Sequence, residues 1–263
     1  MMTATIELTE RDIRIFQALH THRTLTTPQV GELFFNGTHS RAAQRRLLKL
    51  AQHDMVDRFV PRQGHWNAPY HWTLALEGAR IFSGRQGLTP QQIGYRPGTQ
   101  RRLLISSQLP HTTGLAQSYM AFASNARATQ GASLQRWWSQ GRCQTNWGHH
   151  VRPDAYLRWR QNDTDVDAFI EYDTGTEPLA RVAAKVSRYR NLAEETQLRS
   201  PVLFIVTGPK RLTNLCRVLD VGGGWVPVHV TTLDQLTYPG PTCPIWRRAG
   251  DPACTLRSII ELT

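Results

Sequence analysis

Three helical patterns occupy the first fifty or so residues and two strand patterns follow them, an order that allows few small folds. The helical patterns begin at Thr9, Thr27 and Ser40, residue types that cap helix N-termini. Asp12 can complete a capping box with Thr9, and Pro28 takes the first helical position after Thr27. Apolar residues then recur every three or four positions, so each helix is expected to bury one face. The residues of the third helix expected to face inward are Ala43, Leu47 and Leu50.

Two short strands and a fourth helix complete the N-terminal domain. Residues 57–61 alternate between polar and apolar and are predicted as a strand, 62–64 are predicted as a turn, and 70–74 as the returning strand. Residues 77–82 are predicted as one more short helix. Helix, helix, helix, strand, strand, helix is the order of a winged helix-turn-helix domain, which we place at residues 1–83.

A segment rich in Gly, Gln, Pro and Arg, residues 84–104, is predicted as a linker. Residues 105–263 are predicted as a second domain of the α/β class. Its expected order is helix 109–129, strands 134–138, 151–159 and 166–172, helix 178–198, strand 201–206, helix 210–219 and strand 225–230. The late strand–helix–strand units require parallel neighbours, so the sheet is expected to be mixed.

The chain is strongly basic, with 31 Lys and Arg residues against 20 Asp and Glu. The imbalance is concentrated, because the stretch from Gly78 to Pro153 contains nine arginines and no acid. A chain of this kind usually meets nucleic acid or an anionic membrane. It has no apolar run long enough to span a bilayer and no signal-peptide pattern, so a cytoplasmic location is expected. Its four cysteines form no C-x-x-C pair and are expected to be free thiols.

The third helix carries a basic face, because three of its cations recur every four residues. In a helix-turn-helix, the corresponding helix enters the major groove of DNA, where arginine can bond to guanine edges or to phosphate. The predicted DNA-binding residues are Arg41, Gln44, Arg45, Arg46, Lys49 and, at the tip of the wing, Arg62. The alternative is a solvated basic face on an ordinary helical bundle.

Carboxylates lie at the ends of two strand patterns in the second domain. Asp154 follows Arg152-Pro153, and Glu171 and Asp173 end the next apolar strand. They resemble the acids of PD-(D/E)XK nucleases, in which an Asp near the start of one strand and an acid-x-Lys on the next hold Mg²⁺ and activate water. The resemblance extends to the order of helices and strands. It departs at the lysine, because Asp173 occupies that position.

Two adjustments would restore such a site. Asp173 could be a third metal ligand beside Asp154 and Glu171, since carboxylates suit a hard cation. Lys185, at the border of the buried face of the following helix, could supply the missing ammonium, with Arg181 as the next candidate. The predicted catalytic residues are therefore Asp154, Glu171, Asp173 and Lys185, with Mg²⁺ as cofactor if the site is active. The alternative is structural, with Glu171 and Asp173 in ion pairs with Arg152, Arg181 or Lys185.

The string FIEYDTGTEPLAR from Phe169 to Arg181, with Lys185 and Arg188-Tyr189 after it, resembles the signature of the replication-relaxation family. The upstream Arg152-Pro153-Asp154 and the N-terminal winged helix agree with this resemblance. Members of the family are encoded mainly on plasmids and integrative elements of Gram-positive bacteria, and their name links them to plasmid replication and DNA relaxation. The resemblance implies a DNA-acting protein of a mobile element and leaves its activity open.

Three functions are compatible with these features. The favoured one is a DNA-binding protein acting in plasmid or mobile-element replication, mobilisation or transfer. Double-stranded DNA is then the main partner, a relaxase or replication protein is a candidate partner, and a homodimer is a candidate assembly. The alternatives are a Mg²⁺-dependent DNA-nicking or cleaving endonuclease and a transcriptional regulator. Four tryptophans, at positions 137, 138, 147 and 159, could stack on unpaired bases, but core positions are the better expectation.

Overall fold

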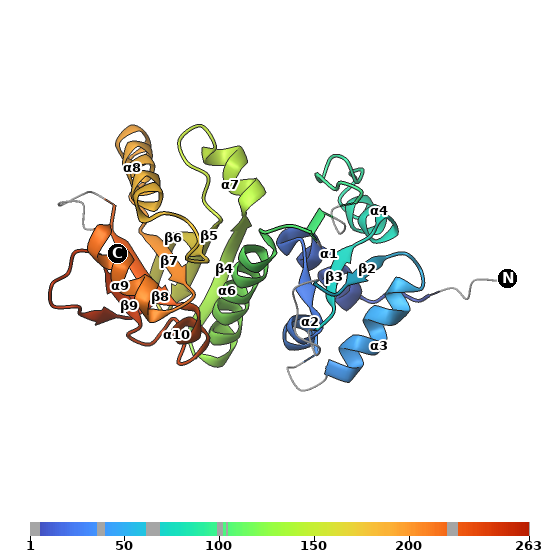
Figure 1. Cartoon of the computed structure of the whole chain (residues 1–263). Helices are drawn as coiled ribbons and strands as arrows, with labels where there is room; N and C mark the ends of the chain where they lie inside the picture. Colours follow the sequence, from blue (N-terminus) through green and yellow to red (C-terminus); the bar gives the residue numbers. More distant parts are fainter. Residues whose placement is uncertain are drawn as a thin grey trace. The chain divides into compact units, whose positions relative to one another are not determined.

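A computed structural model of the chain describes residues 6–35, 40–61, 69–98, 102–103, 105–219 and 226–262 (Figure 1). The chain divides into two compact units, residues 1–116 and 117–263. The division falls within helix α6 (Leu109–Ala128), downstream of the predicted linker. Part of that linker packs on the N-terminal unit: His20 Nε2 donates to the carbonyl oxygen of Ile93 at 2.8 Å, and Tyr95 packs against the core.

The N-terminal unit has the predicted order of elements, with one short strand added. Its elements are α1 (Glu10–His22), β1 (Leu25–Thr26), α2 (Thr27–Phe34), α3 (Ser40–Ala51), β2 (Val56–Phe59), β3 (His71–Leu74) and α4 (Leu76–Gly84). The three strands form an antiparallel sheet in the order β1-β3-β2. The sequence missed β1, which is only two residues long.

Capping residues set where the first two helices begin. The capping box between Thr9 and Asp12 is confirmed. The cap of α2 is Thr26 rather than the predicted Thr27, because Thr26 forms the reciprocal capping box with Gln29 and Pro28 lies in the first turn. The fully buried residues that hold this unit together include Ile15, Phe16, Leu25, Ala43, Leu47, Leu50 and Trp72.

The C-terminal unit is a mixed sheet covered by helices, as predicted for the α/β class. After α6 come β4 (Ala132–Ser139), α7 (Gln140–Trp147), β5 (Ala155–Gln161), β6 (Thr164–Asp173), α8 (Leu179–Thr196), β7 (Val202–Val206), α9 (Pro209–Val218), β8 (Val228–Thr232), α10 (Leu233–Thr237), β9 (Trp246–Arg248), β10 (Leu256–Arg257) and the 3-10 turn η1 (Ile259–Glu261). The strand order is β10-β9-β8-β7-β6-β5-β4. Strands β6, β7 and β8 are parallel, and the pairings on either side of them are antiparallel.

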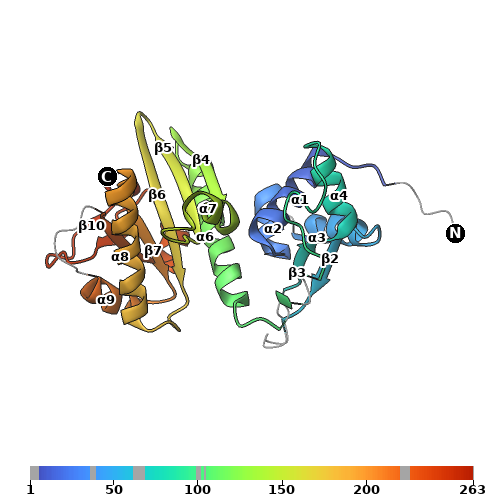
Figure 2. The same cartoon turned by 90° about the horizontal axis from the view of Figure 1, so that it is seen from above.

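Helices lie on both faces of this sheet (Figures 1 and 2). On one face, Tyr156 and Phe169 pack with residues of α7, α8 and α9. On the other face, Phe122 of α6 contacts the rings of Trp137, Trp159 and Trp246. The alternation follows from the strand period, since successive side chains point to opposite faces. Glu171, two residues after Phe169 on β6, therefore lies on the face of the sheet that α8 covers.

Candidate nucleic-acid interface and carboxylate site

Helix α3 separates its apolar and basic residues as predicted. Ala43, Leu47 and Leu50 are fully buried in the core of the N-terminal unit. Four of the predicted DNA-binding residues are exposed, namely Arg41, Gln44, Arg45 and Lys49. The apolar stripe fixes the helix on the domain, so these side chains are presented to solvent by a rigid support. Arg62 of the predicted wing lies outside the described residues.

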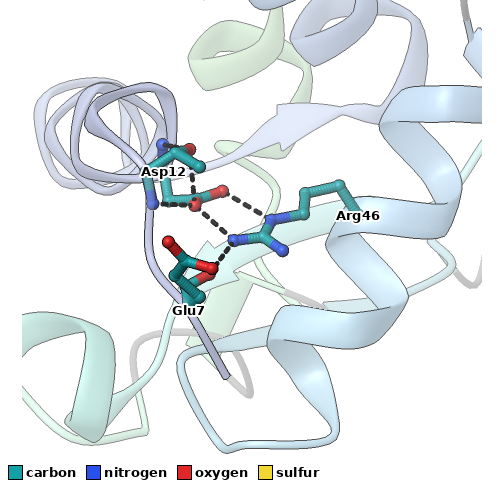
Figure 3. Close-up of polar contacts among 4 residues, drawn as sticks. Glu7, Asp12 and Arg46 are labelled. Atoms are coloured by element: carbon teal, nitrogen blue, oxygen red, sulfur yellow. Dashed lines mark hydrogen bonds and ion pairs between the residues drawn. The ribbon is translucent and has the colours of Figure 1, made fainter. Parts of the chain in front are cut away.

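Arg46 differs from the other basic residues of α3, because it is only partly exposed and is bound by Asp12 and Glu7 (Figure 3). Its Nε donates to Oδ1 of Asp12 at 2.8 Å, and its Nη2 donates to Oδ2 of Asp12 at 2.5 Å and to the carbonyl oxygen of Glu7 at 2.8 Å. The Asp12 side chain is fully buried and also accepts hydrogen bonds from the backbone and hydroxyl of Thr9. The prediction placed Arg46 on DNA, whereas these contacts engage its guanidinium in packing α3 on α1.

The electrostatics of this pair are consistent with its geometry. Burial alone would raise the pKa of Asp12, but the hydrogen bonds from Arg46 and Thr9 outweigh burial and hold the pKa below its ordinary value. The hydrogen bond to Asp12 raises the pKa of Arg46. Both groups are therefore charged across the ordinary pH range, and the pair is a fixed bidentate ion pair.

The predicted carboxylates gather at one end of β5 and β6. Asp154 stands just before β5, and its Oδ2 accepts a hydrogen bond of 2.9 Å from the backbone N–H of Tyr172 in β6. Glu171 and Asp173 lie two residues apart on β6. All three carboxylates are buried, with 3–8% of each residue exposed.

Glu171 is closed off by two donors from α8. Lys185 donates to Oε2 of Glu171 and the hydroxyl of Tyr189 donates to Oε1. Lys185 and Tyr189 are four residues apart, so they share one face of the helix. Lys185 was predicted to supply the missing ammonium of a catalytic site, with an ion pair as the alternative, and the structure has it in an ion pair with Glu171. The sequence did not single out Tyr189 as a partner, although its spacing from Lys185 carried the signal.

The protonation of this pair reflects its burial. Burial raises the pKa of Glu171 to about 8, with the charge of Asp154 adding to the rise and Lys185 opposing it. Burial would lower the pKa of Lys185, but Glu171 and Asp154 raise it. Glu171 therefore holds its proton more tightly mainly because it is buried, whereas Lys185 holds its proton more tightly because two carboxylates lie close to it.

Asp173 forms its ion pair with a residue of a different helix, α9. Its Oδ2 accepts a hydrogen bond of 2.7 Å from Nε of Arg211 in α9, and its Oδ1 accepts one of 2.7 Å from the backbone N–H of Gly175. Arg211 also donates to the carbonyl oxygen of Glu177 at 2.6 Å. Arg181, the second candidate for the missing cation, lies 3.7 Å from the Glu177 carboxylate and is exposed. The sequence missed Arg211, because nothing local links it to a residue 38 positions earlier.

This arrangement does not fit a divalent cation held by Asp154, Glu171 and Asp173. Their oxygens already accept from backbone N–H groups and from Lys185, Tyr189 and Arg211. Across the described ranges, no group of three or more His, Cys, Asp or Glu side chains is placed to hold a metal ion. The residue types are those of a magnesium site, but their geometry is that of two closed ion pairs.

Two of the tryptophans that were candidates for stacking on bases are packed within the C-terminal unit. Trp159 is fully buried, and Trp147 lies against Tyr156 and Phe169. The cysteines are free, as expected. In the part of the chain that the structure describes, no helix combines the length and the apolarity that crossing a membrane requires.

The family model for replication-relaxation proteins matches residues 16–204, most of the chain. No curated protein matches this chain. Among solved structures, the restriction endonuclease FokI is similar over 89% of this chain and 45% of the endonuclease chain, with 12% identity and a TM-score of 0.31. The chain thus spans less than half of the endonuclease. So weak a likeness is no evidence for a shared fold or a shared activity.

Proposed function

Because the chain belongs to the replication-relaxation family, we propose that it is a DNA-binding protein that acts in replication, mobilisation or transfer of a plasmid or another mobile element. The observation that supports DNA binding most directly is the exposed basic face of α3, set on a buried apolar stripe. The N-terminal unit, residues 1–116, has 14 Lys and Arg against 7 Asp and Glu, so this face lies in a basic field that would attract a polyanion.

The test is the salt dependence of duplex binding. Each phosphate contact contributes roughly 0.9 to the slope of log K against log salt concentration. The double variant Arg45→Ala with Lys49→Ala should bind more weakly and lower the slope by about 2. The matched control is Arg80→Ala with Arg85→Ala, which removes the same charge from α4 and the residue that follows it. Equal slopes for the wild type and the α3 variant would remove α3 from the interface, and no salt-sensitive binding by the wild type would refute the proposal.

For the C-terminal unit, we propose a role in holding DNA or docking a partner rather than in cutting. The closed ion pairs of Glu171 with Lys185 and of Asp173 with Arg211 support this choice, because neither carboxylate is open to a metal ion or to substrate. The endonuclease alternative is tested with supercoiled plasmid in Mg²⁺ or Mn²⁺. Nicking by the wild type that disappears in both Asp154→Ala and Glu171→Ala would overturn this part of the proposal. Nicking that survives both substitutions would come from elsewhere.

A further inference from the structure

The acid-free stretch of the sequence extends well beyond the helix-turn-helix. Its last part, from Gln117 to Pro153, lies in the C-terminal unit and forms the second half of α6, β4 and α7. Four of its residues are arginines and none is acidic: Arg127, Arg136, Arg142 and Arg152. The basic face of α3 does not account for this second concentration of positive charge.

Two of these arginines meet at one tryptophan. The guanidinium carbons of Arg136 in β4 and Arg142 in α7 lie 5.3 and 4.7 Å from the ring centroid of Trp138. Both arginines are exposed. The ring of Trp138 is held in turn by Trp147 and Tyr156, at centroid distances of 5.3 and 5.4 Å. The cation–π contacts orient both guanidiniums without any carboxylate, so their N–H donors remain for another acceptor.

Asp167, two strands from Arg136 in the same sheet, is already engaged. Arg136 pairs across the strands with Arg158, which stands opposite Asp167 on the next strand. Arg158 binds Asp167 through three hydrogen bonds of 2.6–3.1 Å. Neither Arg136 nor Arg142 forms an ion pair with any residue in the described ranges. Among the residues that the structure describes, no acid therefore neutralises the positive charge at this corner.

We propose that Arg136 and Arg142, which we call the arginine corner, bind the phosphate backbone of duplex DNA as a second contact surface. This inference rests on the proposed function and adds a contact from the C-terminal unit. Phosphate is the acceptor that fits two oriented guanidiniums. A stacked base does not fit, because Trp138 already contacts two guanidiniums and two aromatic rings and a base would have to displace one of them. The corner is thus suited to a paired backbone rather than to unpaired bases.

The experiment measures binding of a labelled duplex and of a single strand of the same length against salt. Arg136→Gln with Arg142→Gln should bind the duplex several-fold more weakly and lower the salt slope by about 2. Its control is Arg160→Gln with Arg217→Gln, which removes two exposed arginines elsewhere in the unit and should leave the slope nearly unchanged. A corner variant that matches this control, while the α3 variant loses affinity, would overturn the arginine corner and leave the proposed function intact. A corner effect on the single strand alone would also overturn it.

A second measurement uses the wild-type protein, so that the test of the arginine corner does not depend on a variant that folds. Phenylglyoxal modifies exposed arginines, and mass spectrometry locates the modified residues. Duplex DNA should protect Arg136 and Arg142 several-fold against modification, while Arg160 and Arg217 should remain as reactive as before. Equal modification of Arg136 and Arg142 with and without bound duplex would refute the assignment.

Discussion

Arg46 of the basic helix α3 and Asp12 in the first turn of α1 are 34 residues apart, yet two hydrogen bonds of 2.8 and 2.5 Å join them. The Asp12 side chain is fully buried and that of Arg46 is 20% exposed. The pair connects the first turn of one helix to the middle of the other, so it fixes the orientation in which α3 presents its exposed cations. Arg46 thus serves the basic face indirectly, through packing.

Removal of Arg46 should destabilise the protein far more than removal of its neighbour. Arg46→Met leaves the Asp12 carboxylate buried without its cation, which costs about 3–5 kcal/mol. Arg45→Met changes an exposed residue and should stay within about 0.5 kcal/mol of the wild type. Urea unfolding of both variants measures the difference, and similar midpoints would show that the Asp12–Arg46 pair is unimportant for stability.

The same pair predicts a loss of stability in acid. The folded-state pKa of Asp12 is lowered, so its contribution is present above the ordinary carboxyl pKa of about 4 and is lost as pH falls through the lower folded value. Asp12→Asn should be less stable than the wild type near neutral pH, and the gap should narrow below pH 4. Unfolding free energies measured from about pH 2 to 7 check this. A gap that is constant with pH would mean that Asp12 does not titrate as inferred.

How far the sequence predicts this domain depends on the distance between partners. The capping box of Thr9 with Asp12 spans three residues and could be predicted from spacing alone. The partner of Asp12 on α3 could not be predicted from the sequence. That helix has three arginines, and only the tertiary packing selects Arg46. The prediction therefore gave all the cations of α3 one role, whereas the fold leaves Arg41, Arg45 and Lys49 exposed and pairs Arg46 with Asp12.

The carboxylate site shows the same limit. Helical spacing placed Lys185 at the border of the buried face of α8, from which its long side chain could reach the acids. In the structure its ammonium donates a hydrogen bond to Glu171. The partner of Asp173 could not be predicted, because Arg211 comes from α9, beyond an intervening helix and strand. Helix α7 was missed because only Cys143 among its eight residues is buried, so it has no apolar period. Strands β9 and β10, three and two residues long, are too short for an alternation to register.

Glu171 predicts a pH dependence of the opposite sign. Its pKa rises from an ordinary value of 4.5 to about 8 in the folded state, so the folded protein holds the extra proton between these values. Stability contributed by that proton is present below about pH 4.5 and is lost as pH rises towards about 8. Glu171→Gln, which cannot ionise, should flatten this decline. An equally steep decline from pH 5 to 8 in the variant would assign it to another group.

A glycine in α4 is expected to be essential for packing. A Cβ at Gly78 would overlap the backbone carbonyl oxygen of Met55, and would lie 2.8 Å from Cδ1 of Leu74. Gly78→Ala should therefore destabilise the protein by about 1–3 kcal/mol, despite the better helix propensity of alanine. Gly84→Ala at the end of the same helix meets nothing within 4 Å and should be neutral or slightly stabilising. Thermal unfolding separates the two, and equal melting temperatures would contradict the predicted overlap.

The ion pair of Glu171 with Lys185 gives a prediction in which the cost of a substitution changes with pH. Lys185→Met removes the ammonium that favours the ionised form of Glu171, so the pKa of Glu171 should rise further. At pH 5 the carboxyl is protonated and the variant should lose little stability. At pH 9, about one unit above the pKa of Glu171, the wild type gains from ionising this carboxyl, whereas the variant must keep it protonated, so the loss should be greater than at pH 5 by about 1–2 kcal/mol. Arg188→Met, an exposed change on the same helix, serves as the control. Adding Glu171→Gln to Lys185→Met should abolish the pH dependence of the loss. A loss that stays equal at the two pH values in the single variant would show that Lys185 acts through packing of its stem rather than through its charge.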